Sequence, residues 1–169
     1  MTTADFLTTL NILVAFLGVL FVALTVYEFF SLRQLRNDFR QFREDLASEH
    51  YRHQQASHKV IASYGVADYE MKIALLKQAI QIDASVFNGY NSLGYAYIGH
   101  GDFLKAADAF KSAIQLHPYD KAGYCDLAYA YSKLGDNALR DEYLAKAVEI
   151  DPTAESDIAN DARFNLHTK

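Results

Sequence analysis

The first third of the chain changes abruptly from an uncharged apolar run to a charged helical pattern. Residues 6–27 contain no Asp, Glu, Lys or Arg and are almost wholly apolar. A helix of about 22 residues is roughly 33 Å long, slightly more than the roughly 30 Å hydrocarbon core of a bilayer. The pattern therefore predicts a helix that crosses a membrane once, and we assign residues 1–32 to an N-terminal membrane anchor.

A cleaved secretory signal is the competing interpretation of this run. Such a signal needs a basic start, an apolar core of about 7 to 15 residues and a small-x-small cleavage site. Here Asp5 is the only charged residue before the run, and bulky side chains dominate residues 24–30. These features favour an anchor that is retained.

The charges that flank the run predict its orientation. Four arginines follow it and no basic residue precedes it; they are Arg33, Arg36, Arg40 and Arg43. Basic residues collect on the cytoplasmic side of a membrane span. We therefore expect the C-terminal part of the chain in the cytoplasm; the alternative, with the topology inverted, is a periplasmic domain.

Residues 33–52 are predicted to form an amphipathic juxtamembrane helix or linker. Apolar side chains recur there at alternating intervals of three and four, which places them on one face of a helix; they are Leu32, Leu35, Phe39, Phe42 and Leu46. The four arginines occupy a neighbouring strip. This seam of apolar and basic residues is a contact surface, for which a partner subunit, a second copy of the chain and anionic lipid remain open as occupants.

A second pattern repeats with a period of about 34 residues. Tyr90, Leu93, Gly94, Tyr97, Phe110, Ala113 and Pro118 are followed one period later by Tyr124, Leu127, Ala128, Tyr131, Leu144, Ala147 and Pro152. Gly101-Asp102 and Gly135-Asp136 stay in the same register. A fixed period of this length is typical of repeat proteins built from helix pairs.

These residues resemble the tetratricopeptide repeat family, whose pattern has an aromatic, Leu-Gly and Tyr on the first helix, then Ala, Phe and a closing Pro. Tyr90 and Tyr124 replace the usual Trp, and Arg140 replaces the Ala at the position of Ala106. The resemblance implies an all-α solenoid of antiparallel helix pairs over residues 53–169. We assign a degenerate repeat to residues 53–86, repeats to 87–120 and 121–154, and a polar capping helix to 155–169.

The resemblance also implies which side chains line the concave face of the solenoid. These are Asn88, Asn91, Tyr95, Ile98, Cys125, Tyr129 and Lys133, with Ala122 beside them and with Ser57, Ile61 and Tyr64 from the degenerate repeat. This wall is aromatic and amide-rich with little charge, unlike the basic clamp that captures acidic C-terminal peptides. We expect a protein segment gripped by Tyr95 and Tyr129, with Asn88 and Asn91 bonding its backbone.

Composition excludes several other classes of function. The 169 residues carry 16 basic and 21 acidic side chains, a net charge of −5, so the chain is not expected to bind nucleic acid. No phosphate-binding loop, nucleophile elbow, His-Glu-x-x-His or Cys-x-x-Cys motif is present, so neither an enzyme nor a cofactor is expected. His50 and His53 share a helical face, but no cysteine or carboxylate pair completes a metal site.

The sequence therefore predicts a membrane-anchored binding module that acts as an adaptor, assembly factor or accessory subunit of a membrane complex. Bacterial inner-membrane assembly factors and small mitochondrial import receptors have a similar layout, and we favour the bacterial inner membrane. Two alternatives stay open: a permanent structural subunit docked through its transmembrane and juxtamembrane helix, and a periplasmic maturation factor.

Overall fold

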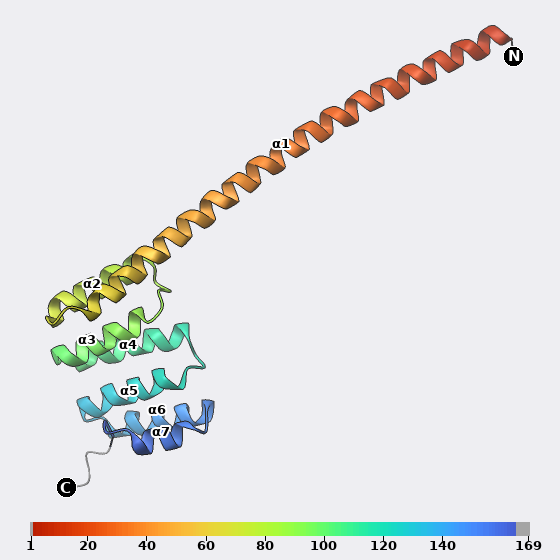
Figure 1. Ribbon diagram of the computed structural model, residues 1–169. Helices are drawn as coiled ribbons and strands as arrows, with labels where there is room; N and C mark the ends of the chain where they lie inside the picture. The colour runs from red at the N-terminus through yellow and green to blue at the C-terminus, as the bar shows by residue number, and fades with distance from the viewer. Residues whose placement is uncertain (1, 165–169) are drawn as a thin grey trace. The chain divides into compact units, whose positions relative to one another are not determined.

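The computed structural model describes residues 2–164, and these form seven α-helices and no β-strand (Figure 1). The helices are α1 (Thr3–Tyr64), α2 (Tyr69–Ile82), α3 (Gly89–His100), α4 (Phe103–Leu116), α5 (Lys121–Leu134), α6 (Asn137–Ile150) and α7 (Ala154–Asn160). The predicted all-helical solenoid is confirmed. Met1 and residues 165–169, which belong to the predicted anchor and capping helix, lie outside the described residues.

The chain divides into two units after Glu49, within the 62-residue helix α1. Every described side chain of the first unit is exposed, including the large apolar ones from Phe6 to Leu46. Among the described helices, α1 has the length and the apolar composition of a membrane span, although signal sequences and buried core helices share these properties. The predicted continuation of the helix beyond residue 27 is confirmed by its unbroken course to Tyr64.

Local capping chemistry explains where the helices of the second unit begin and end. Four of them start after an aspartate whose side chain accepts a hydrogen bond from a backbone N–H of the first turn: Asp68, Asp102, Asp120 and Asp136. Helices α3 and α5 end at Gly101 and Gly135, whose φ angles of 89° and 78° suit glycine best. The Gly-Asp pairs thus end one helix and begin the next within two residues.

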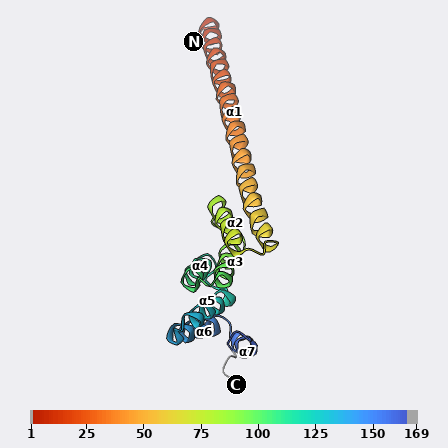
Figure 2. The same ribbon diagram turned by 90° about the vertical axis from the view of Figure 1, so that its left-hand side faces the viewer.

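These short turns make neighbouring helices antiparallel, and the pairs stack into a solenoid (Figure 2). Phe110, Leu76 and Leu127 are the largest hydrophobic side chains with almost no exposed surface. Many of the other core positions are alanine, which lets the helices approach closely. The core therefore runs through the stack rather than lying within any one helix pair.

The last turns of α1 and the whole of α2 contribute to the same core. Ala56 and Val60 join one buried cluster with Ile73 and Leu76. The Lys59 Nζ atom also donates to the Gln78 side chain at 2.8 Å. The segment before residue 87 therefore packs as a pair of helices.

Gly94 leaves space on α3 for the Phe110 ring of α4. A Cβ atom at residue 94 would lie 2.5 Å from Cε1 of the Phe110 ring, which real contacts do not permit. One repeat later, the larger Ala128 is accompanied by the smaller Leu144 in place of Phe110. A small residue on the first helix thus faces a large one on the second, and a larger residue faces a smaller one. This is expected if the two side chains of each pair share one space between the helices.

We expect Gly94→Ala to lower the free energy of unfolding by roughly 1–3 kcal/mol, because the added methyl group forces the Phe110 ring to move. Phe110→Leu in the same chain should offset part of this loss, so that the double variant is less destabilised than the sum of the single variants. Denaturant unfolding followed by circular dichroism in detergent measures all three. Additive losses would show that the two positions do not compete for space.

Helix α7 is shorter than the sequence predicted. It ends at Asn160, and Asp161 forms its C-cap through a backbone N–H bond to Ile158. Residues 161–164 then turn: the Arg163 N–H bonds to the Asp161 side chain, and the Phe164 N–H bonds to the Asp161 carbonyl at 3.0 Å. The helix ends before Arg163, because the Asp161 side chain accepts the backbone N–H of Arg163.

Candidate functional site

The predicted groove residue Tyr95 lies on α3 and joins a polar cluster on α5. Its ring packs edge-on against Phe110, with the ring centroids 5.3 Å apart, and its hydroxyl donates a hydrogen bond to Asp126. Only 6% of Asp126 is exposed to solvent, whereas 44% of Tyr95 is exposed. Tyr95 therefore packs against the core through its ring and is still partly exposed to solvent.

The turn after α7 supplies a guanidinium to this cluster. The Nη1 atom of Arg163 donates to Asp126 Oδ1 at 2.8 Å and to the Tyr95 hydroxyl at 3.1 Å. The Nε atom donates to Asp161 Oδ2 at 2.7 Å, which holds the guanidinium in place from its own backbone turn. One arginine thus links α3, α5 and the residues that follow α7.

Tyr129, the second aromatic residue of the predicted groove, lies beside the same arginine. The guanidinium carbon of Arg163 is 5.4 Å from the centre of the Tyr129 ring, and Lys133 Nζ is 5.2 Å from it. Phe164 meets the Tyr129 ring edge-on, at a centroid distance of 6.4 Å. Cation–π and edge-to-face contacts of these kinds are favourable.

Burial governs the electrostatics of the cluster. It raises the pKa of Asp126, although the hydrogen bonds from Tyr95 and Arg163 oppose the change. Burial and the neighbouring carboxylate also raise the pKa of Tyr95. Burial acts to lower the pKa of Arg163, but its bonds to Asp161 and Asp126 outweigh this and raise it.

The two predicted amides lie near the start of α3, the helix that also carries Tyr95. Asn88 precedes α3 with a left-handed φ of 57°, and Asn91 lies in the first turn of that helix. Both line a cavity of about 240 Å³, together with Leu116 of α4 and with His117, which follows that helix. The residues of the Tyr95 cluster do not line this cavity.

The remaining predicted groove residues have mixed environments. Ile98 is partly buried against the core, and burial raises the pKa of the half-buried Cys125 thiol. Tyr64, at the end of α1, bonds through its hydroxyl to Ser92 on α3 at 3.0 Å. His53 is bonded to Asp83 at 2.6 Å rather than free in solvent. Within residues 2–164, no cluster of metal-ligating side chains is present.

Sequence reasoning missed the charged half of the site. Asp126, Arg163 and Phe164 were not assigned to the groove, whose wall was expected to carry little charge. The only available sign was Asp126 itself, an acidic residue between the scaffold positions Tyr124 and Leu127. Nothing in the repeat pattern indicates that Arg163, 37 residues further along the chain, returns to it.

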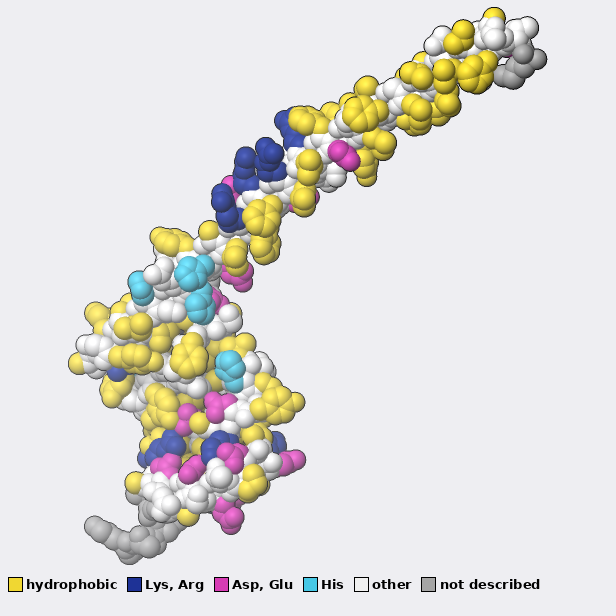
Figure 3. All heavy atoms as spheres, turned by 45° about the vertical axis from the view of Figure 1, so that its right-hand side comes forward, with side chains coloured by type: hydrophobic (Ala, Val, Ile, Leu, Met, Phe, Trp, Pro, Cys, Tyr) yellow, Lys and Arg dark blue, Asp and Glu magenta, His cyan; other side chains and the backbone are white. Residues whose placement is uncertain are grey.

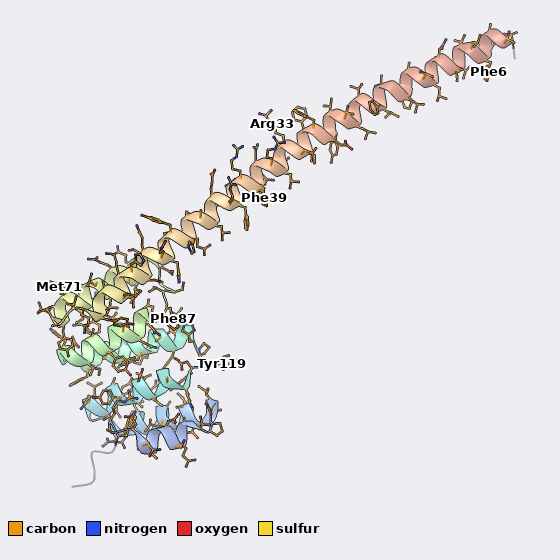
Figure 4. The ribbon with its side chains drawn as sticks, viewed as in Figure 1. Phe6, Arg33, Phe39, Met71, Phe87 and Tyr119 are labelled. Atoms are coloured by element: carbon orange, nitrogen blue, oxygen red, sulfur yellow. The ribbon has the colours of Figure 1, made fainter. Side chains whose placement is uncertain are left out.

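The juxtamembrane seam is described within the first unit alone. Leu35, Phe39 and Phe42 are 64%, 68% and 63% exposed, so no described residue of the first unit covers the apolar face of this stretch. Figure 3 shows the basic side chains together on one side of this helix, and Figure 4 shows Arg33 and Phe39 pointing in different directions. A bare apolar face beside a basic strip is typical of a contact surface.

Comparison with known proteins supports the repeat assignment. Two spans of the chain, residues 87–120 and 122–153, match the family model of the tetratricopeptide repeat. The match covers the two predicted repeats and less than half of the chain. No curated protein matches the chain.

Solved structures of MamA are similar in fold. One MamA crystal structure has a TM-score of 0.56 at 22% identity, covering 62% of this chain and 58% of that one. A second has the same TM-score and identity, and 63% of its length is covered. A point mutant of MamA gives a TM-score of 0.53 at 26% identity, over 59% of this chain and 72% of the other. The chain thus spans less than two thirds of the first two, and the likeness is one of fold.

Proposed function

We propose that this protein is a membrane-anchored adaptor, which binds a protein partner in the groove at Tyr95 and Tyr129 and brings it to a membrane complex as an assembly factor or accessory subunit. The combination that carries the proposal is a single chain with an exposed apolar helix long enough to span a bilayer and a repeat solenoid with an aromatic site. The four arginines after the apolar run support a cytoplasmic location for the repeats, as at the inner membrane of a bacterium.

Anchoring in a membrane allows a groove of low affinity to bind a partner in the same membrane. Two binding sites held on one membrane meet at an effective concentration far above that of the free proteins. A groove with few anchoring side chains can then select a partner that is itself in the membrane. The exposed seam at Leu35, Phe39 and Phe42 offers a second contact to the same partner.

A permanent structural subunit is the second candidate, and the exposure of the seam is the observation that favours it. Large obligate interfaces are more apolar than transient ones, and a row of exposed phenylalanines next to a bilayer fits that description. In this case the complex would copurify at fixed stoichiometry, with the seam rather than the groove holding it together.

A crosslinked pull-down of the full-length protein in mild detergent, read by mass spectrometry, separates the two candidates. The groove variant is Tyr95→Ala with Tyr129→Ala, and the seam variant is Phe39→Asp with Phe42→Asp. Tyr119→Ala is the matched control, because Tyr119 is 87% exposed and takes no part in the Tyr95 cluster. Circular dichroism establishes that each variant is folded.

We expect one partner to be lost with the groove variant and retained with Tyr119→Ala. Loss of all partners with the seam variant alone would instead identify a subunit docked through its juxtamembrane helix. A folded groove variant that retains every partner would contradict the adaptor function. A reporter fused after Lys169 tests the topology, since activity only outside the cytoplasm would place the repeats in the periplasm.

A further inference from the structure

Residues 161–164, here called the C-terminal tail, occupy the site where the proposed function places a partner. Tyr95 and Tyr129 are the two side chains expected to grip a bound segment, and both contact Arg163. Phe164 packs against Tyr129 next to the arginine. The tail thus makes the contacts that a short peptide with an arginine followed by an aromatic residue would make.

The charge of the site favours a cation. Asp126 is buried with Arg163 in place, and among residues 2–164 its side chain receives hydrogen bonds from Tyr95 and Arg163 alone. When the tail leaves, Asp126 loses the ion pair with Arg163. The arginine of an incoming segment would restore that ion pair and its hydrogen bonds.

The surrounding groups favour arginine over lysine in that place. A guanidinium is planar, so it can lie over the Tyr129 ring and still direct an N–H group at both Asp126 and the Tyr95 hydroxyl. Lysine carries a compact ammonium that cannot stack in this way. Next to the arginine, the edge of Tyr129 accepts an aromatic ring such as that of Phe164.

Space for a longer segment adjoins the tail. A cavity of about 440 Å³ is lined by Arg163, Phe164 and side chains of α5 and α6, among them Ser132 and Leu144. A peptide that replaced the tail would extend into this cavity. The tail follows the seven-residue helix α7, and Asp161 supplies its turn.

We propose that the groove is selective for a protein segment containing arginine followed by an aromatic residue, and that the C-terminal tail is an internal copy of this segment which closes the groove until a partner displaces it. The inference rests on the proposed function, because it names the chemistry of the partner for the same groove. A tethered tail competes at a high effective concentration, so only a well-matched or membrane-concentrated partner opens the site.

The test uses a fluorescent peptide that copies residues 158–169, added to the protein in detergent and followed by fluorescence anisotropy. The proteins are the full chain, a chain lacking residues 161–169, and full-length Arg163→Ala. We expect both altered chains to bind the peptide at least about tenfold more tightly than the full chain, because an occupied groove lowers the apparent affinity by the fraction that is open. Circular dichroism reports whether each chain is folded.

Matched peptides and a groove variant test the chemistry. With the shortened chain, we expect binding to weaken severalfold when the arginine of the peptide is replaced by lysine, and to be lost when it is replaced by alanine. Replacement of the peptide phenylalanine by alanine should also weaken binding. Asp126→Asn in the shortened chain should remove the preference for arginine over lysine.

Three results would overturn the inference. The first is a folded shortened chain and a folded Arg163→Ala chain that both fail to bind the peptide, which makes the tail a structural cap. The second is unfolding of both chains, which makes Arg163 part of the core. The third is peptide binding that ignores the arginine.

The peptide assay and the pull-down can reject the arginine-selective groove and the adaptor function separately. Peptide binding without a partner in the pull-down would retain the arginine-selective groove and reject the adaptor function. A partner that depends on Tyr129 but binds equally well with the tail present or removed would retain the adaptor function. It would reject the arginine-selective groove that the tail closes.

Discussion

Deletion of residues 6–27 is expected to release the chain completely from the membrane fraction. About 20 apolar residues in a helix make insertion effectively irreversible, whereas the basic strip that remains contributes only about 1 kcal/mol for each arginine near an anionic surface. The structure leaves this stretch bare, with Leu13, Phe16 and Leu20 all exposed. Membrane fractionation followed by carbonate extraction measures the effect.

The control for this deletion keeps the length of the helix. Val19→Arg places a charge at the middle of the run, where insertion costs roughly 2.5–3.5 kcal/mol, and should reduce the membrane-bound fraction without shortening the chain. Mass spectrometry of the intact wild-type protein distinguishes an anchor from a signal sequence. Loss of the first 30 or so residues from the mature chain would reject the anchor, as would full-length protein in the soluble fraction.

Leu76→Ala is expected to lower the free energy of unfolding by roughly 2–5 kcal/mol, which is a large part of the stability of a domain of this size. Leu76 has no exposed surface and lies in α2, in the same buried cluster as Ala56 and Val60. The truncated side chain would leave a cavity among helices that meet largely through alanines and cannot easily close it. Denaturant unfolding of the full-length protein in detergent measures the loss.

Met71→Ala is the matched control on the same helix. Met71 is 59% exposed, so its truncation should change stability by less than about 0.5 kcal/mol. The comparison decides whether residues 50–86 are an integral helix pair of the solenoid, since the family match begins only at residue 87. Equal effects of the two substitutions would show that α2 is not packed as the structure describes.

The repeats were predictable because their determinants are local. Helix ends depend on a capping aspartate such as Asp102 or a left-handed glycine such as Gly101, and both can be read within a few residues. The period of 34 residues then places equivalent residues, such as Tyr97 and Tyr131, on equivalent helix faces, and both are buried. Stacking of such units follows from the apolar faces they leave.

The surroundings of the predicted groove residues were predictable only in part. The family pattern leaves the positions of Tyr95 and Tyr129 free for contacts, and the structure places both beside Arg163. The resemblance assigns Asn88 and Asn91 to the same face, and the structure places both in a cavity against α4. A family pattern indicates the face on which a side chain lies and not the neighbours that it meets.

By itself, the sequence determined the helical solenoid, its turns and the uncharged run that suits a membrane span, because each depends on periodicity and capping within one or two helices. The tertiary structure alone decided that Arg163 meets Asp126 across 37 residues and that Phe164 lies against Tyr129. Those contacts depend on how far each repeat rotates on the next and on a side chain at residue 161 that ends α7 early. Neither the rotation between repeats nor the early end of α7 produces a periodic pattern in the sequence. The contacts of Arg163 and Phe164 therefore became visible only in the tertiary structure.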